Sequence, residues 1–233
     1  MYKLIKQNVF LIALIVCVVQ GFGQSLELHI APVFGNEPIT EDTWFVSTND
    51  DSMQFESIRF YLSDIQFDLN NGQTIKDALP AHLVDVFEPS TLKISLQNIN
   101  YKDIKTMHFN IGIDSTTSVS GALSGDLDPT KGMYWAWQSG YINMKIEGRS
   151  PQCKNRKNVF QFHIGGYMQP FYAMRHVELP IKPFFTEGVV LKIDLSKFFE
   201  KININTQNSI MIPGKEAVQL ADLSIQMFSI DEK

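Results

Sequence analysis

The alternation of apolar and polar residues along this chain is typical of β-strands. Every second residue is apolar in five segments, residues 26–30, 107–111, 142–146, 160–164 and 191–195. Each of these segments predicts a strand with one buried face and one face toward water or a neighbouring layer. In IRFYLSDIQF (58–67) the apolar positions change phase near Asp64, which predicts a β-bulge or kink at that residue.

Helical patterns are few, and residues 195–201 and 215–220 are the candidates for short helical turns. We find no internal repeat and no linker composition, so we predict an all-β protein, a single antiparallel β-sandwich of roughly eight to ten strands. Two connections in it are long, Gly35–Gln54 and Ser115–Met133. Because loops on a rigid sandwich carry most binding residues, these two are where a site is expected.

Residues 1–23 have the features of a signal peptide. Lys3 and Lys6 precede an apolar run of about a dozen residues, and Gly23 supplies a small residue at the expected cleavage point. The run is shorter than the roughly 20 residues of a membrane span. We therefore predict a secreted or periplasmic protein with a cleaved leader, one domain over residues 24–233, and no membrane span in the mature chain.

The charge balance argues against two classes of partner. The whole chain has 20 Lys and Arg against 25 Asp and Glu, a formal charge of −5, and loss of Lys3 and Lys6 with the leader would make it −7. Nucleic acids and anionic membranes are bound by clustered Lys and Arg. Neither is expected to be a partner here.

Cys153 is the single cysteine left after removal of the predicted leader, so no intramolecular disulfide is expected. It lies in SPQCKNRKN, a basic and polar segment. This context predicts an exposed loop thiol, with Lys154 and Arg156 favouring the thiolate and intermolecular disulfides forming on air oxidation.

No catalytic motif is visible, neither a phosphate-binding glycine loop, nor HExxH, CxxC or a nucleophile elbow, and we do not expect an enzyme. The histidines are the candidate metal ligands. Alternation places His29, His108 and His163 off the apolar faces of their strands. His163 is the foremost candidate, because Gly165 and Gly166 follow it and permit close approach of another segment or a sharp turn.

Trp135 and Trp137 lie in LDPTKGMYWAWQSGYINMKIEG (127–148), and their spacing of two predicts one shared strand face, with an interruption at QSG. Three interpretations are open. The pair fills a core between sheets, it forms an exposed platform that stacks on sugars, or one indole is modified or lies beside a metal.

Four segments, IRFYLSDIQF (58–67), HFNIGID (108–114), LDPTKGMYWAWQSGYINMKIEG (127–148) and FQFHIGGY (160–167), resemble the MbnP family of copper-binding proteins associated with methanobactin operons. The resemblance implies a β-sandwich-like fold and a periplasmic or secreted copper binder. It also implies a tryptophan oxidised to kynurenine by a dihaem peroxidase-type partner enzyme.

Carried over by motif, the family's histidine matches His163, and its tryptophans match Trp135 and Trp137, of which we favour Trp135 for the modification. Many relatives also have a histidine in the loop before the tryptophan motif, and DSTTSVSGALSGDLD contains none. His29 and His108 are then the candidates to complete a copper site with His163. The alternative function is a metal-free interaction module that binds glycan or protein through exposed aromatics and loops.

Overall fold

The computed structural model describes residues 26–96, 103–138, 140–182 and 188–231. The predicted leader, residues 1–23, lies outside these residues. Among the described helices, none has the length and apolar character needed to cross a bilayer.

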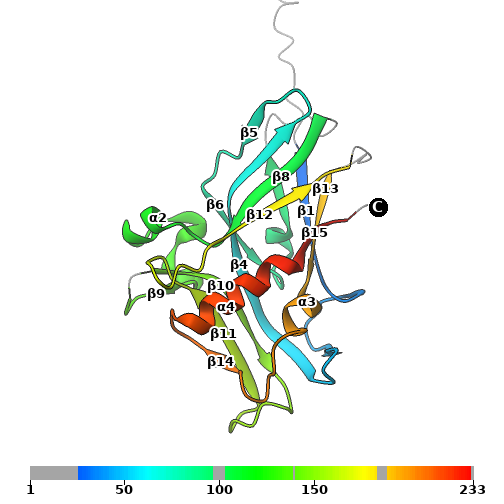
Figure 1. Ribbon diagram of the computed structural model, residues 1–233, viewed down its shortest axis with the longest axis vertical. Coiled ribbons are helices and arrows are strands. Elements are labelled where there is room, and N and C mark those ends of the chain that lie inside the picture. Colours follow the sequence, from blue (N-terminus) through cyan, green and yellow to red (C-terminus); the bar gives the residue numbers. More distant parts are fainter. Residues whose placement is uncertain (1–25, 97–102, 139, 183–187, 232–233) are drawn as a thin grey trace, which may run out of the picture.

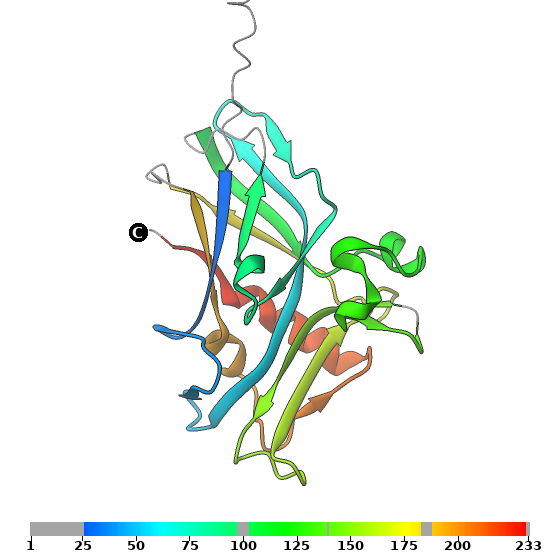
Figure 2. The same cartoon turned by 180° about the vertical axis from the view of Figure 1, so that it is seen from behind.

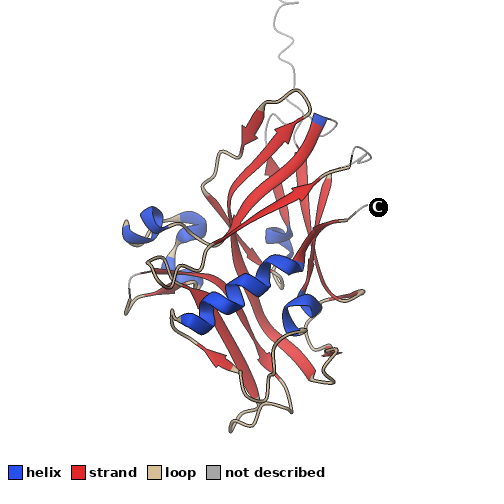
Figure 3. Cartoon of the chain, in the orientation of Figure 1, coloured by secondary structure: helices blue, strands red, loops and turns tan. Residues whose placement is uncertain are grey.

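The described strands form two sheets (Figures 1 and 3). The smaller sheet contains β15 (Phe228–Ile230), β13 (Val189–Asp194), β1 (Leu26–Phe34) and β2 (Glu37–Pro38) in that order, with β7 (Lys93–Leu96) also paired to β1. The larger sheet has the order β12 (Arg175–Pro180), β8 (Ile104–Ile111), β4 (Ser52–Leu69), β10 (Gly140–Arg149), β11 (Val159–Gly165) and β14 (Ser209–Ile210). Four short strands flank it, β3 (Trp44–Val46), β5 (Thr74–Lys76) and β6 (Ala81–Asp85) on β4 and β9 (Tyr134–Trp135) on β10.

The five alternating segments all form strands, and the β-sandwich-like fold is confirmed. The sheets are mixed rather than purely antiparallel, because β1 pairs parallel with β13 and β11 pairs parallel with β14. Both parallel pairs join segments far apart in the chain, which strand periodicity cannot reveal. The irregularity predicted at Asp64 is present, with φ of 49° and a register shift between Ser63 and Gln66.

Short helices cover the sheets. The two predicted helical segments form α3 (Leu195–Phe199) and α4 (Lys215–Ser224), and α4 packs against β11 and leads into η5 (Ile225–Met227). The remaining described helices are η1 (Pro89–Leu92), α2 (Ser115–Val119), η3 (Gly125–Leu127) and η4 (Pro129–Lys131). The predicted long connection from Ser115 to Met133 is thus built of short helical turns, which project from one flank beside β9 (Figures 1 and 2).

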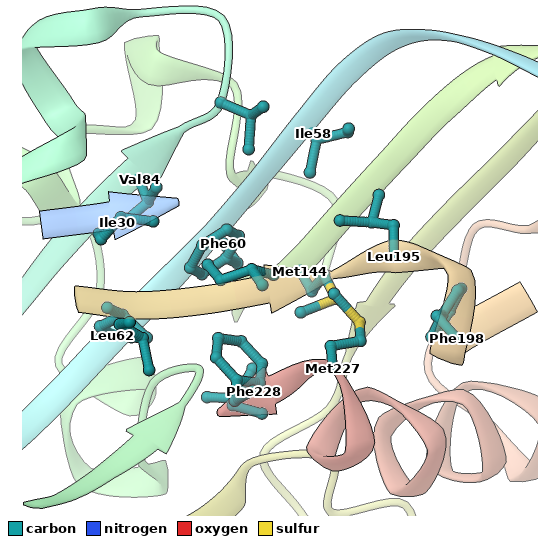
Figure 4. Packing of buried hydrophobic residues seen from close by; sticks show 14 of the residues in the cluster. Ile30, Ile58, Phe60, Leu62, Val84, Met144, Leu195, Phe198, Met227 and Phe228 are labelled. Carbon is teal, nitrogen blue, oxygen red and sulfur yellow. The ribbon is translucent and has the colours of Figure 1, made fainter. Parts of the chain in front are cut away.

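The main core lies between the two sheets. In Figure 4, side chains of β1, β4 and β10 point toward those of α3, η5 and β15, and Phe60, Met144 and Phe228 are buried there. A second cluster lies on the opposite face of β4 and β10, under the α2–η4 segment. Its members are Tyr61, Ala81, Leu83, Ile113, Leu127, Met133, Trp135, Tyr141 and Ile142. The larger sheet is therefore covered on both faces along β4 and β10, and the second face carries the site described next.

Candidate functional site on the outer face of β10 and β11

β11 divides its side chains between two faces. Phe160, Phe162 and Ile164 belong to the main core, so the residues between them point to the opposite, outer face. There His163 lies opposite Lys145 of the neighbouring strand β10, and Gln161 lies opposite Glu147. The pairing of β10 with β11 thus gathers polar side chains on a face that the second cluster partly covers.

His163, Glu147 and Lys145 form a connected, largely buried trio. His163 Nε2 is 2.8 Å from Glu147 Oε1, and Lys145 Nζ is 3.4 Å from Glu147 Oε2. The His163 hydrogen bond is the largest cause that lowers the pKa of Glu147 from 4.5 to about 2, against the opposing effect of burial and with help from the Lys145 charge. An ionised carboxylate only accepts hydrogen bonds, so Nε2 carries the proton and Nδ1 of a neutral His163 keeps its lone pair.

The indole of Trp135 packs over the same strand. A Cβ on Gly165 would lie 2.7 Å from Trp135 Cζ3 and 2.8 Å from Cη2, so the ring occupies the space that a side chain would fill. Gly165 follows His163 by two residues and shares its face, about 7 Å along the strand. The glycine therefore has a specific role, because it admits the indole beside the imidazole.

Trp137 does not share a strand face with Trp135, so that prediction is wrong. β9 ends at Trp135, because Gly140 pairs with Trp135 and closes a short hairpin whose loop contains Trp137. Trp135 is 6% exposed and Trp137 is 64% exposed, with ring centroids 6.0 Å apart. One tryptophan thus fills the second cluster and the other lies on the surface beside it.

The structure does not bring His29 or His108 to His163. His29 lies on β1 in the smaller sheet, with Nε2 3.2 Å from the exposed Glu27. His108 lies on β8 opposite Gln66 of β4, whereas His163 is level with Arg59 of that strand, roughly 20 Å away along it. Across the described ranges, no group of three His, Cys, Asp or Glu side chains is placed to hold a metal ion.

Sequence reasoning missed Glu147, Lys145 and Asn143, all on β10. Alternation in the strand indicates that they are polar and face away from the main core, but it does not show that β11 lies opposite them. Asn143 is buried, its Oδ1 accepts a hydrogen bond from the Ile113 amide at 3.0 Å, and its Nδ2 has no hydrogen-bond partner within the described part of the chain.

The prediction for Cys153 is wrong. The side chain is 0% exposed and belongs to the main core, with Sγ 3.8 Å from the carbonyl oxygen of Ile204. Burial raises the pKa of the thiol to about 11, with a further contribution from the negative charge of Asp51. The neighbouring Lys154 and Arg156 stay exposed, because the turn points its basic side chains outward and the Cys153 side chain inward.

Comparison with known proteins gives one family and one fold match. The family model described as MbnP matches residues 23–212. No curated protein matches the sequence significantly. Among solved structures, MbnP from Methylosinus trichosporium matches with a TM-score of 0.58 at 14% sequence identity, covering 78% of this chain and 79% of that chain. At this identity the structural match supports the fold alone.

Proposed function

This chain belongs to the MbnP family, and from that premise we propose that it is a secreted or periplasmic copper-binding protein in which His163 is a metal ligand. The observation that carries the proposal is the hydrogen bond between His163 and Glu147 on the face that Trp135 covers. We assign the protein a binding role rather than a catalytic one, with copper as its cargo.

The environment of His163 suits an imidazole ligand. Histidines that bind metals usually donate their other ring N–H to a carboxylate, which fixes the tautomer and the orientation of the ring. Glu147 supplies that carboxylate, Lys145 lies against its second oxygen, and His163 Nδ1 is left as the donor. Imidazole nitrogen is a good copper ligand in both oxidation states.

One imidazole is not a complete copper site. The described residues offer no second histidine near His163, so the unmodified side chains would bind copper only weakly. We propose that oxidation of a tryptophan to kynurenine supplies the missing donors, an aryl amine and a ketone. A dihaem peroxidase-type partner would use peroxide to insert two oxygen atoms across the indole C2–C3 bond, and hydrolysis would then release C2 as formate. Trp135 is next to the His163 strand, whereas Trp137 is the indole that a partner can reach directly.

Native mass spectrometry of protein secreted by its own host tests the proposal. We expect the protein to retain one copper ion and His163→Ala to lose it, while His29→Ala, on the other sheet, retains it as the matched control. Peptide mapping would show whether Trp135 or Trp137 carries the mass of kynurenine. Unmodified tryptophans together with no copper retained in excess metal would refute the proposal.

A metal-free interaction module is the second candidate, and the exposure of Trp137 favours it. Trp137 is 64% exposed, and Met168 and Phe171, in the loop that follows β11, are 59% and 41% exposed. Exposed aromatic rings stack on sugars and anchor protein interfaces. Glycan-array binding that disappears in Trp137→Ala, with thermal unfolding unchanged, would support this candidate, and binding that survives in the variant would refute it.

A further inference from the structure

A pair of histidines, His108 and His176, lies on the outer face of β8 and β12, at the edge of the larger sheet. In the pairing of these strands His108 is opposite Glu178, and His176 is opposite Asn110. The residues between them, Phe109 and Val177, point into the main core. All four polar side chains therefore share one face, and the rings of His108 and His176 lie nearly parallel, with centroids 5.8 Å apart and 17° between their planes.

Each of the two rings has one nitrogen held by an oxygen acceptor. His108 Nε2 is 2.9 Å from Asp68 Oδ2, and His176 Nδ1 is 3.0 Å from Asn110 Oδ1. Asp68 Oδ1 also accepts a hydrogen bond from Thr74 Oγ1 at 2.6 Å, so both oxygens of this carboxylate act as acceptors. The held nitrogens are then the protonated ones, which leaves a lone pair on His108 Nδ1 and on His176 Nε2.

We infer that His108 and His176 together bind a divalent transition-metal ion at this sheet edge, with Glu178 as a third ligand. An imidazole nitrogen binds zinc at about 2 Å, which places the ion about 3 Å from the ring centre. At a tetrahedral ion the two ring centres are then about 5 Å apart, so the observed 5.8 Å is within about 1 Å of the separation that binding requires.

Closing the site requires side-chain rotation only. The described residues hold no preassembled three-donor group, and Glu178 Oε2 is 4.0 Å from His108 Nδ1. The Glu178 side chain is 65% exposed and His176 is exposed, so both can turn toward an ion without disturbing the core. Asp68 resembles the carboxylate partners that orient metal-binding histidines elsewhere.

The donor chemistry selects the ion. Two imidazole nitrogens and one carboxylate oxygen suit Zn²⁺, Ni²⁺ and Cu²⁺, whereas Ca²⁺ and Mg²⁺ require mostly oxygen ligands and Cu⁺ favours sulfur. The cluster lies on β8, β12 and the C-terminal half of β4, roughly 20 Å along β4 from the level of His163. It is therefore a separate site, and it does not depend on the proposed function.

Calorimetric titration with Zn²⁺ tests the inference on protein purified without a histidine tag. We expect one zinc equivalent to bind, with the affinity reduced at least tenfold in His108→Ala and in His176→Ala and about tenfold in Asp68→Asn. His29→Ala, on the smaller sheet and outside both proposed sites, is the matched control and retains zinc binding. Thermal unfolding verifies that each variant folds. Absence of zinc binding, or equal affinity in all of these variants, would overturn the inference.

Discussion

Replacing Glu147 by glutamine removes one negative charge from the His163 trio and keeps the shape of the side chain. The pKa of Glu147 falls from 4.5 to about 2, chiefly through the His163 hydrogen bond. Each unit of pKa corresponds to about 1.4 kcal/mol. The ionised carboxylate therefore contributes roughly 3 kcal/mol to folding at neutral pH. Its side chain is 20% exposed, so solvent screens little of this contribution.

The sign of the pH dependence follows from the lowered pKa. The stabilisation is fully present above pH 4.5, the unfolded value, and is lost as the pH falls toward the folded value of about 2. In urea unfolding, the stability difference between the wild type and Glu147→Gln should narrow by about 2 kcal/mol between pH 7 and pH 3. Glu56→Gln, which breaks an exposed pair with Arg149, should cost less than about 1 kcal/mol. A Glu147→Gln difference that does not change with pH would refute the electrostatic reasoning.

Three further substitutions or reagents test the packing. Gly165→Ala should lower the free energy of unfolding by about 1–3 kcal/mol in thermal unfolding, because the new Cβ would displace the Trp135 ring. The control Gly214→Ala, whose Cβ would lie in open space, should cost less than about 1 kcal/mol. Cys153 should stay unreactive toward a thiol reagent at neutral pH until urea unfolds the chain, and non-reducing electrophoresis should show monomer, because the thiol is buried and protonated. Phe199→Ala should cost about 3–5 kcal/mol by urea unfolding, since this buried ring contacts five other phenylalanines.

Local patterns in the sequence were sufficient for the strands. A strand with one buried face must alternate, so the segments that became β1, β8 and β13 could be recognised without knowing their neighbours. The irregularity at Asp64 was equally local, because a bulge changes the phase of the apolar residues. The parallel pairing of β1 with β13 was not accessible, since it depends on contacts between distant segments.

A long-range contact decided the position of Cys153, and a local hairpin decided that of Trp137, the two residues that sequence reasoning misplaced. Cys153 lies in a polar segment, yet its thiol is buried against Ile204, 51 residues later. Trp137 left the predicted strand face because the pairing of Gly140 with Trp135 closes the hairpin before it. In both cases the composition of the surrounding segment did not determine whether the side chain is exposed. The contact made by the folded chain determined it.

The His163 trio keeps charged side chains on a face that the second cluster partly covers, although the stability of the sheet does not require them there. Replacing a buried ionic cluster by apolar residues of similar volume is often neutral or stabilising, so the sheet does not need these charges in order to hold together. What an apolar replacement cannot provide is an imidazole held in one tautomer, with Glu147 at 2.8 Å on Nε2 and Nδ1 left as a donor. His29 lacks this arrangement, because its side chain is 33% exposed and that of its partner Glu27 is 49% exposed. The metal-binding role is therefore better placed at His163 than at His29, and the loss of copper in His163→Ala but not in His29→Ala is the result that this reasoning requires.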